Sequence, residues 1–344
     1  RKIGTGHRIL YGVPGSGKTV ILVAMARLLA QDEKRVLVLC YNISLHAYLA
    51  RTLEELKPYV RVERFGAWAR EQGAPVNADE HAFGQGLLNI LNTGCSEAGK
   101  YDAVLIDEGQ DFRASWFKSA VMALSEPADG TLVIAYDLAQ NLYRAEKPVW
   151  SHLGIKARGR ISKFSKNYRN TREIVAAAWS FGLPEAPGDE DTPQAVALKP
   201  ENCLRSGPWP DLRSCSNRTA QVRQCLEIAK GLVAGNTDGA TRQDGMRAEE
   251  IMVLCKLKAT RDELETAFSE QKLGVRVSTI YGSRGLQAKA VIVVEAEALK
   301  DPEDRALMYV AATRPTDLLC VLWSRETSIT RELGSNLQDA RTHS

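Results

Sequence analysis

One glycine-rich stretch of the chain has the residue types that bind polyphosphates. It reads GVPGSGKT over residues 12–19, a full match to the pattern G-x-x-x-x-G-K-[ST]. The apolar run Ile9–Tyr11 precedes it, and Val20–Ala30, rich in Ala and Leu and without Gly or Pro, follows it. The sequence therefore predicts a buried strand, a tight turn and a helix, which is the context that this pattern requires.

A loop of this kind binds phosphates through its backbone N–H groups and the positive end of the following helix. We expect Lys18 to reach the β- and γ-phosphates of ATP and the Thr19 hydroxyl to bind Mg²⁺. A chance glycine-rich loop is the alternative, and the flanking strand and helix count against it. The residues expected to bind the nucleotide here are Gly12, Pro14, Gly15, Ser16, Gly17, Lys18 and Thr19.

Two adjacent acids, Asp107 and Glu108, directly follow the apolar run Ala103–Ile106. An acid at the carboxyl end of a buried strand beside a phosphate loop can hold Mg²⁺, so we expect Asp107 to be a metal ligand together with Thr19. Glu108 can then act as the general base on the attacking water. An acid pair in a surface turn is the alternative, and the four apolar residues before the pair count against it.

These acids belong to a series of segments that resembles the motifs of superfamily 1 helicases of the UvrD/Rep/PcrA type. DEGQD resembles the family's DEAQD box, and the other segments follow in the family's order between Arg8 and Trp323. Several motifs in order are far more specific than any one of them. The segments are DEGQD (107–111), AYDLAQNLY (135–143), NYRN (167–170), TIYGSRGLQ (279–287) and YVAATR (309–314), with YNIS (41–44) in the place of the family's TNKAA.

The resemblance implies roles for residues that spacing alone would not identify. It implies that Gln140 senses the γ-phosphate, that Tyr168 stacks on adenine, and that Arg169 and Arg314 contact the phosphates as arginine fingers. Together with Lys18 and Glu108 these give the expected catalytic set, Lys18, Glu108, Gln140, Arg169 and Arg314. Gly285 and Gln287 are implied as further nucleotide contacts. The implied contacts to single-stranded DNA are Tyr41, Asn42, Tyr143, Thr279 and Ser283.

The chain also departs from the family pattern. Tyr143 runs into Arg144 where an aromatic stacking platform is usual, so base stacking is expected to fall to Tyr143 or Trp150, or to be weakened. The large insertions of processive unwinding enzymes have little room here.

The alternation of apolar runs with helical stretches predicts an α/β fold with parallel sheets flanked by helices. From the resemblance we expect two RecA-like P-loop domains. The first spans residues 1–150 with a small helical insertion at about 57–102, the second spans 159–330 and carries the arginine fingers, and 331–344 form a polar tail. We expect the boundary between Lys147 and Arg158, a loop at Phe181–Asp211, and a strand at Arg160–Phe164 in the second domain.

The amino-acid composition excludes few classes of function. The 344 residues carry a net charge of only +3, which permits a polyanionic partner without arguing for one. No apolar run is long enough to span a membrane, and the seven scattered cysteines are best explained as reduced thiols, so we expect a cytoplasmic protein. An opening Arg1 suggests a piece of a longer chain.

The sequence thus predicts an ATP-hydrolysing motor that requires Mg²⁺ and acts on single-stranded DNA, with RNA left open. A 3′-to-5′ direction rests on the resemblance alone. The catalytic arginines and Lys18 fall in different domains, so ATP is expected to bind between the two. One rival is an ATP-gated regulatory module that controls a partner or fused nuclease domain. A second rival, a P-loop kinase or small NTPase, would need neither the second domain nor its arginines.

Overall fold

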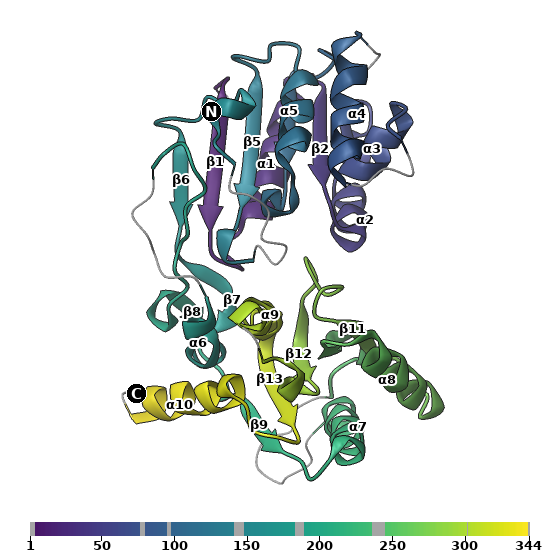
Figure 1. Cartoon of the computed structure of the whole chain (residues 1–344), viewed down its shortest axis with the longest axis vertical. Coiled ribbons are helices and arrows are strands. Elements are labelled where there is room, and N and C mark those ends of the chain that lie inside the picture. The colour runs from purple at the N-terminus through teal and green to yellow at the C-terminus, as the bar shows by residue number, and fades with distance from the viewer. Residues whose placement is uncertain are drawn as a thin grey trace. The chain divides into compact units, whose positions relative to one another are not determined.

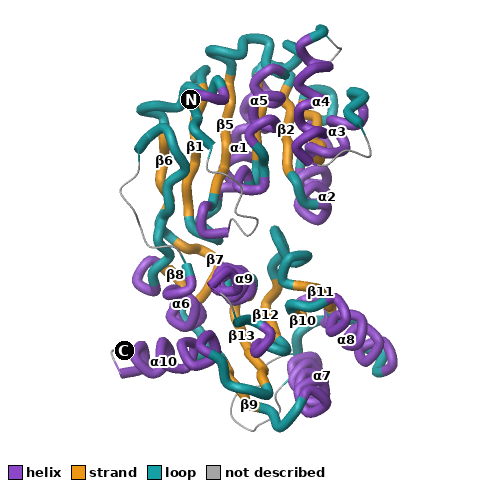
Figure 2. The backbone as a smooth tube through the Cα atoms, in the orientation of Figure 1, coloured by secondary structure: helices purple, strands orange, loops and turns teal. Residues whose placement is uncertain are grey.

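The structure, a computed structural model, describes residues 4–75, 80–94, 98–140, 148–182, 189–235, 245–300 and 302–342. The chain divides into two compact units, and each is a mixed α/β structure with parallel strands flanked by helices (Figure 1; Figure 2). Unit 1 comprises Arg1–Ser165 and Leu183–Ala197, and unit 2 comprises Lys166–Gly182 and Leu198–Ser344. None of the described helices is both long and apolar enough to cross a bilayer.

Unit 1 is built on a six-stranded sheet in the order β3-β2-β4-β5-β1-β6. All neighbouring strands run parallel. Every residue of β2, β4 and β5 is buried, as expected for parallel strands that have helices on both faces and therefore read as continuous apolar runs. The strands are β1 (His7–Gly12), β2 (Val36–Cys40), β3 (Val60–Arg64), β4 (Ala103–Ile106), β5 (Thr131–Tyr136) and β6 (Ile161–Phe164).

Helices cover both faces of this sheet, and Figure 1 shows α1 and α5 on opposite faces. Leu22, Ala26 and Leu29 of α1 are buried at helical spacing and pack in one core with Val36 and Leu105 of the sheet. The helices are α1 (Lys18–Gln31), α2 (Ile43–Thr52), α3 (Phe65–Glu71), α4 (Glu80–Asn92) and α5 (Ala114–Met122), with short 3₁₀ turns at η1 (Glu54–Leu56), η2 (Gly109–Asp111), η3 (Leu138–Gln140) and η4 (Ser151–Leu153).

Unit 2 contains a five-stranded parallel sheet in the order β11-β10-β12-β13-β9, and β7 and β8 form a separate parallel pair. Cys225 of α7 and Phe268 of α8 pack in one core with Val253 and Ile292. The strands are β7 (Asn167–Thr171), β8 (Cys203–Arg205), β9 (Asp211–Ser214), β10 (Ile251–Cys255), β11 (Arg276–Thr279), β12 (Ala288–Val293) and β13 (Pro315–Trp323). The helices are α6 (Arg172–Ala178), α7 (Arg218–Ala234), α8 (Lys258–Glu270), α9 (Pro302–Ala312) and α10 (Ser328–Thr342), with η5 (Trp179–Phe181), η6 (Pro200–Asn202), η7 (Ala248–Glu250) and η8 (Ala296–Ala298).

The structure corrects the expected division of the chain. Strand β6, which the sequence assigned to the second domain, pairs along its whole length with β1 in the sheet of unit 1. The chain therefore first passes from unit 1 to unit 2 between Ser165 and Lys166, and not between Lys147 and Arg158. The supposed loop Phe181–Asp211 includes β8, and part of it returns to unit 1, where the Thr192 carbonyl accepts a hydrogen bond from Tyr11 (3.2 Å).

Two other regions differ from expectation. The insertion expected to be helical at about 57–102 begins with β3, which pairs with β2 and extends the sheet. Residues 331–342 of the expected polar tail belong to α10, because Ile329, Leu333 and Leu337 recur every four residues and are buried on one face of that helix. Its Asn336 side chain donates a hydrogen bond to the Ala177 carbonyl of α6 (3.0 Å).

Candidate functional site

The phosphate-binding sequence forms the turn between β1 and α1. Gly15 and Gly17 have φ of 69° and 89°, in the left-handed region that favours glycine, and Gly17 directly precedes the first residue of the helix. Gly12 is constrained by close approach, because a Cβ atom there would lie 2.6 Å from Ser16 Oγ and 3.0 Å from Phe164 Cβ. The glycines therefore allow the tight turn that precedes α1.

Lys18 is the first residue of α1, and its side chain folds back over the turn. Its Nζ donates hydrogen bonds to the carbonyls of Gly12 (2.8 Å) and Val13 (3.0 Å) and lies 3.9 Å from Asp137 Oδ2. The side chain is buried. This geometry holds the ammonium group against the glycine-rich turn, where it can neutralise a phosphate.

Thr19 and Asp107 meet at the carboxyl end of the sheet. The Thr19 hydroxyl donates to Asp107 Oδ2 (2.7 Å), and Asp107 Oδ1 accepts from the backbone N–H of Glu108 (2.9 Å). Burial, with a smaller contribution from the neighbouring Glu108 carboxylate, raises the pKa of Asp107 to about 6. A buried carboxylate beside a hydroxyl is a donor set that suits a hard cation.

A hydrogen-bonded chain links Glu108 to Gln140. Glu108 has the left-handed φ of 52°, and its Oε2 accepts from the Gln110 amide. Gln110 Oε1 accepts from the backbone N–H of Asp137 (3.0 Å), and Asp137 Oδ2 accepts from Gln140 Nε2 (2.7 Å). Burial raises the pKa of Asp137 as well. The structure thus brings the expected catalytic residues Lys18, Glu108 and Gln140 to one edge of one sheet.

Gln110 and Asp137 connect these residues, and neither was predicted to have a role. Both were visible in the sequence, Gln110 inside the DEGQD segment and Asp137 directly after an apolar run. Their function depends on pairing between segments 27 positions apart, which only the fold reveals.

The residues at this edge fit a nucleotide and a magnesium ion. Ser16 Oγ is buried and has no hydrogen-bond partner among the described residues, as expected for a group that faces a phosphate. Within the described ranges there is no cluster of three or more His, Cys, Asp or Glu side chains that could hold a metal. Mg²⁺ usually takes only one or two protein carboxylates and completes its shell with water and phosphates.

In unit 2 the NYRN segment lies against the strand that follows YVAATR. Asn170 Nδ2 donates to the carbonyls of Thr313 (3.1 Å) and Pro315 (2.5 Å), and Asn167 donates to Asn170 Oδ1 (2.8 Å). Two of the segments that carry the family resemblance are therefore joined inside this unit. Tyr168, the expected adenine-stacking residue, is 60% exposed at this place.

The two expected arginine fingers differ in burial. Arg169 is half-buried, whereas Arg314 is 1% exposed. Arg314 Nε donates to the Val310 carbonyl (3.0 Å) and Nη1 to the Leu286 carbonyl (3.3 Å). Arg314 is thus part of the packing of unit 2. Nearby, Gly285 has a φ of 72°, and Gln287 is exposed.

The residues expected to contact single-stranded DNA differ in how exposed they are. Tyr41 is 37% exposed, and its ring packs on Trp116 at a centroid distance of 5.9 Å. The Asn42 side-chain oxygen caps α2 by accepting from the backbone N–H groups of Ser44 (2.7 Å) and Leu45 (3.2 Å). Asn42 therefore has a structural role at this helix end, whereas part of the Tyr41 ring is accessible.

Two of the remaining expectations meet a structural obstacle. Ser283 is fully buried and its hydroxyl donates to the Ile280 carbonyl (2.7 Å), so in this conformation it cannot touch a nucleic acid. Trp150 is also buried, and its Nε1 donates to the Tyr11 hydroxyl (2.8 Å), so it is not a base-stacking platform. Thr279 is half-buried and accepts from the Gly282 N–H, and Tyr143 lies outside the described residues.

Comparison with known proteins identifies a helicase-like segment in unit 2. Residues 274–322 match the family model of the UvrD-like helicase C-terminal domain. The matched region includes β11, β12 and α9 and contains the TIYGSRGLQ and YVAATR segments. It supports a helicase-like fold for this part of the chain. Among curated proteins no similar sequence was found.

Solved structures show weaker likeness. The C-terminal domain of a possible DNA helicase from Lactobacillus plantarun WCFS1 is 17% identical over 49% of this chain and 96% of its own, with a TM-score of 0.37. Arterivirus nonstructural protein 10, a helicase, is 11% identical over 95% of this chain, with a TM-score of 0.46. This chain spans 61% of the arterivirus protein. At these values neither structure lends a role to any residue of this chain.

Proposed function

We propose that the chain is an ATP-dependent motor of the UvrD-like class that moves on single-stranded DNA as a 3′-to-5′ translocase or helicase. One observation carries the proposal: Lys18, the Thr19–Asp107 pair and the chain from Glu108 to Gln140 lie together at the glycine-rich turn of unit 1. These are the groups that phosphoryl transfer requires for positioning and charge neutralisation. The UvrD-like match in unit 2 favours this function over a P-loop kinase or small NTPase.

Each group then has one task. Lys18 neutralises charge on the β- and γ-phosphates, and Thr19 with Asp107 holds Mg²⁺, which when bound shields the phosphate oxygens. The Glu108 carboxylate takes the proton of the attacking water as the water oxygen bonds to the γ-phosphorus and ADP departs. Gln140 positions the γ-phosphate through its link to Asp137.

Arg169 and Arg314 belong to unit 2, which lacks a phosphate loop of its own. We propose that the two units act as RecA-like domains and that these arginines reach ATP when the units close on it. Arg314 would have to exchange its two carbonyl partners for the phosphate. Hydrolysis then removes the ligand that both units share, and repeated closure is converted into steps along the strand. We place this activity in the cytoplasm, on DNA or on RNA.

A second candidate is an ATP-gated module that regulates a partner, for example a nuclease domain. The burial of Trp150 favours it, because one of the two aromatic residues considered for base stacking is then excluded. The ATP site would be the same, and only its use would differ.

Hydrolysis measured with different nucleic acids separates the two candidates. We expect single-stranded DNA to stimulate ATP hydrolysis by the purified chain, and strand binding to weaken steeply as salt rises, because phosphate contacts release counterions. Duplex DNA and RNA serve as comparisons. If no nucleic acid stimulates hydrolysis and none binds at low salt, the motor is excluded and the regulatory module becomes the better account.

A further inference from the structure

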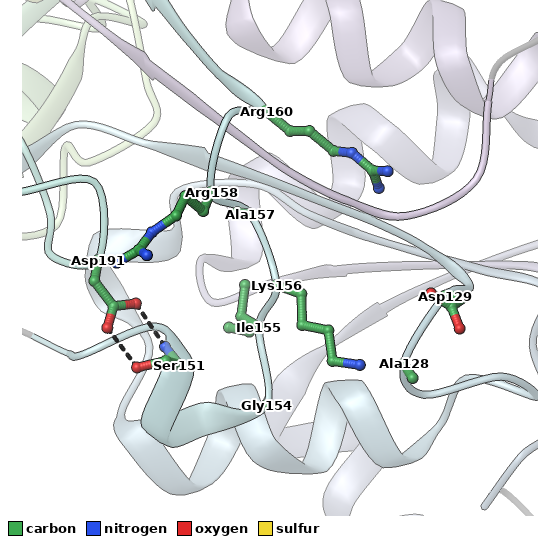
Figure 3. Close-up of a pocket in the computed structure, with 10 residues that line it drawn as sticks. All are labelled: Ala128, Asp129, Ser151, Gly154, Ile155, Lys156, Ala157, Arg158, Arg160 and Asp191. Atoms are coloured by element: carbon green, nitrogen blue, oxygen red, sulfur yellow. Dashed lines mark hydrogen bonds between the residues drawn. The ribbon is translucent and has the colours of Figure 1, made fainter.

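A hollow of about 630 Å³ opens on unit 1, remote from the phosphate loop (Figure 3). Asp129, two residues before β5, and Arg160, directly before β6, line it, so it lies at the amino ends of these strands. The phosphate loop follows the carboxyl end of the parallel strand β1. A strand of this length separates the two places by about 20 Å. We call the site formed by Lys156, Arg158 and Arg160 the basic hollow.

The cations of the basic hollow are exposed and keep most of their hydrogen-bond donors available. They alternate with the buried residues Ile155 and Ala157, so the polypeptide is anchored while the charged side chains reach solvent. Arg160 donates one long hydrogen bond to the Thr5 carbonyl (3.4 Å). Across the described part of the chain, no carboxylate forms an ion pair with any of the three. An ammonium and a guanidinium together carry eight N–H donors.

Two of the acids nearby, Asp191 and Glu190, accept hydrogen bonds from neutral donors. Asp191 accepts from the backbone N–H of Ser151 (2.8 Å) and from its hydroxyl, the two bonds drawn in Figure 3. The hydroxyl bond is the main reason that the pKa of Asp191 is lowered, and the positive charge of Arg158 makes a smaller contribution. Glu190 accepts from the Gly159 N–H (3.0 Å), and Asp129 remains as an exposed acid at the rim. Arg158 is therefore attracted to Asp191 without a hydrogen bond to it, and the N–H donors of the hollow remain available to a ligand.

The positive charge continues beyond the hollow. Residues 149–165 include four cationic residues and no acidic one, and the fourth, Lys163, is exposed on β6. β6 is the edge strand of its sheet, so Arg160 and Lys163 mark a row of charge along that edge. A compact anion would need only the hollow, whereas a row of cations suits a polymer with regularly spaced charges.

We propose that the basic hollow and Lys163 bind the phosphodiester backbone of a single-stranded nucleic acid along the β6 edge of the sheet, from the end opposite the ATP site towards Tyr11 of β1, which pairs with Lys163. Phosphodiester oxygens supply the acceptors that the cations lack, and the contact is independent of base sequence. The inference goes beyond the proposed function, because strand binding here requires no ATP hydrolysis. A chain that binds strands without hydrolysing ATP would overturn the proposed function and leave this site intact.

The test compares two double substitutions with the same change in charge. Lys156→Gln with Arg158→Gln removes two cations of the hollow, and Lys34→Gln with Lys118→Gln removes two exposed cations elsewhere on unit 1. Arg160 is kept because of its bond to the Thr5 carbonyl. Binding of a fluorescent single-stranded oligonucleotide is measured by anisotropy across a salt series, and thermal melting confirms that both variants fold.

We expect the hollow variant to bind on the order of tenfold more weakly at low salt, with a slope of log K against log salt shallower by about 1.4, the value for two lost phosphate contacts. The control variant should keep the slope of the original chain. Equal slopes for all three proteins would overturn the proposal. So would loss of inorganic pyrophosphate binding in the hollow variant with strand binding unchanged, because the site would then serve a small anion.

Discussion

Five strands in each of the two sheets follow the same order. The units differ in the turn after the first of these strands, which is glycine-rich after β1 and not after β9. Five strands of unit 1 lie in the order β3-β2-β4-β5-β1, with β6 added beside β1, and those of unit 2 lie in the order β11-β10-β12-β13-β9, so β9 corresponds to β1. Two cysteines occupy equivalent places, because Cys40 is the last residue of β2 and Cys255 is the last residue of β10. The Cys40 thiol donates to the Asn42 carbonyl, and the Cys255 thiol donates to the Leu257 carbonyl. The two units therefore share a five-strand order, and only unit 1 carries the phosphate-loop sequence.

Corresponding positions of the two units have different partners. Lys18 begins α1 and lies against a glycine-rich turn, whereas Arg218 begins α7 and forms ion pairs with Glu263 (2.5 Å) and Glu295 (3.0 Å). Glu295 follows β12 as Glu108 follows β4, and both have a left-handed φ, 61° and 52°. In unit 2 these charges satisfy one another. A shared strand order therefore does not by itself create a site with charges available to a ligand.

The largest effect should come from the arginines that unit 2 would supply. Arg314→Ala should lower single-turnover ATP hydrolysis by on the order of 10³-fold or more, with a much smaller change in ATP affinity, because a finger acts in the transition state. The variant should also melt earlier, since Arg314 is buried. Arg169→Ala should show the same kinetic loss without that penalty, and Lys should rescue neither, because it lacks the planar fork.

Arg305→Ala is the matched control. Arg305 belongs to the same unit and forms an ion pair with Glu332, and it is not among the residues expected to contact the nucleotide. It should lower stability and leave hydrolysis within a few-fold. Normal hydrolysis by Arg314→Ala would show that unit 2 contributes no finger.

The next prediction compares substitutions of Glu108 and Glu295, which both have a left-handed φ. Glu108→Gln should slow hydrolysis by roughly 10²- to 10⁴-fold while ATP still binds, because the amide cannot accept the proton. Glu295→Gln should leave hydrolysis unchanged and lower the melting temperature, because Arg218 and Thr260 lose a charged partner. If both variants hydrolyse alike, the assignment of Glu108 as the base is wrong.

A smaller effect should appear in stability as a function of pH. The folded state raises the pKa of Asp107 to about 6, so it favours the protonated form, and this contribution to stability is lost as pH rises through 6. Asp107→Asn should therefore raise the free energy of unfolding at pH 7.5 by about 1–2 kcal/mol without nucleotide or Mg²⁺. The gain should shrink towards pH 4. Urea unfolding at both pH values measures it, and a pH-independent difference would show that the buried charge of Asp107 is not its cause.

The strands that are buried on both faces of a sheet were predicted from their apolar residues alone. The runs that became β2, β4 and β10 are wholly apolar, β5 is apolar after Thr131, and the phosphate loop fixes the start of α1. The edge strands β3 and β9 were not predicted because their exposed side chains are polar, whereas the edge strand β6 was predicted as a strand but assigned to the wrong unit. β3 reads VRVER and β9 reads DLRS, patterns that suit a solvated edge as well as a loop.

Other errors concern partners distant in sequence. The residues of β6, ISKF, do not indicate that this strand pairs with β1, which lies about 150 positions earlier. The boundary between the units could therefore not be located from the residues around it. The helix α10 was detectable, since Ile329, Leu333 and Leu337 recur every four residues, but the surrounding polar residues suggested a tail. Within the candidate site, the loop and acid pair were predictable, whereas the burial of Ser283, Trp150 and Arg314 was not.

The most direct test of the account is ATP hydrolysis, with saturating single-stranded DNA, by the variants Lys18→Ala and Arg218→Ala beside the original chain. These residues begin the corresponding helices α1 and α7 in the two units. The account predicts that Lys18→Ala abolishes hydrolysis and that Arg218→Ala keeps it within a few-fold while melting earlier. Hydrolysis that survives Lys18→Ala, or that is lost only in Arg218→Ala, would contradict the assignment of the ATP site to the glycine-rich turn of unit 1.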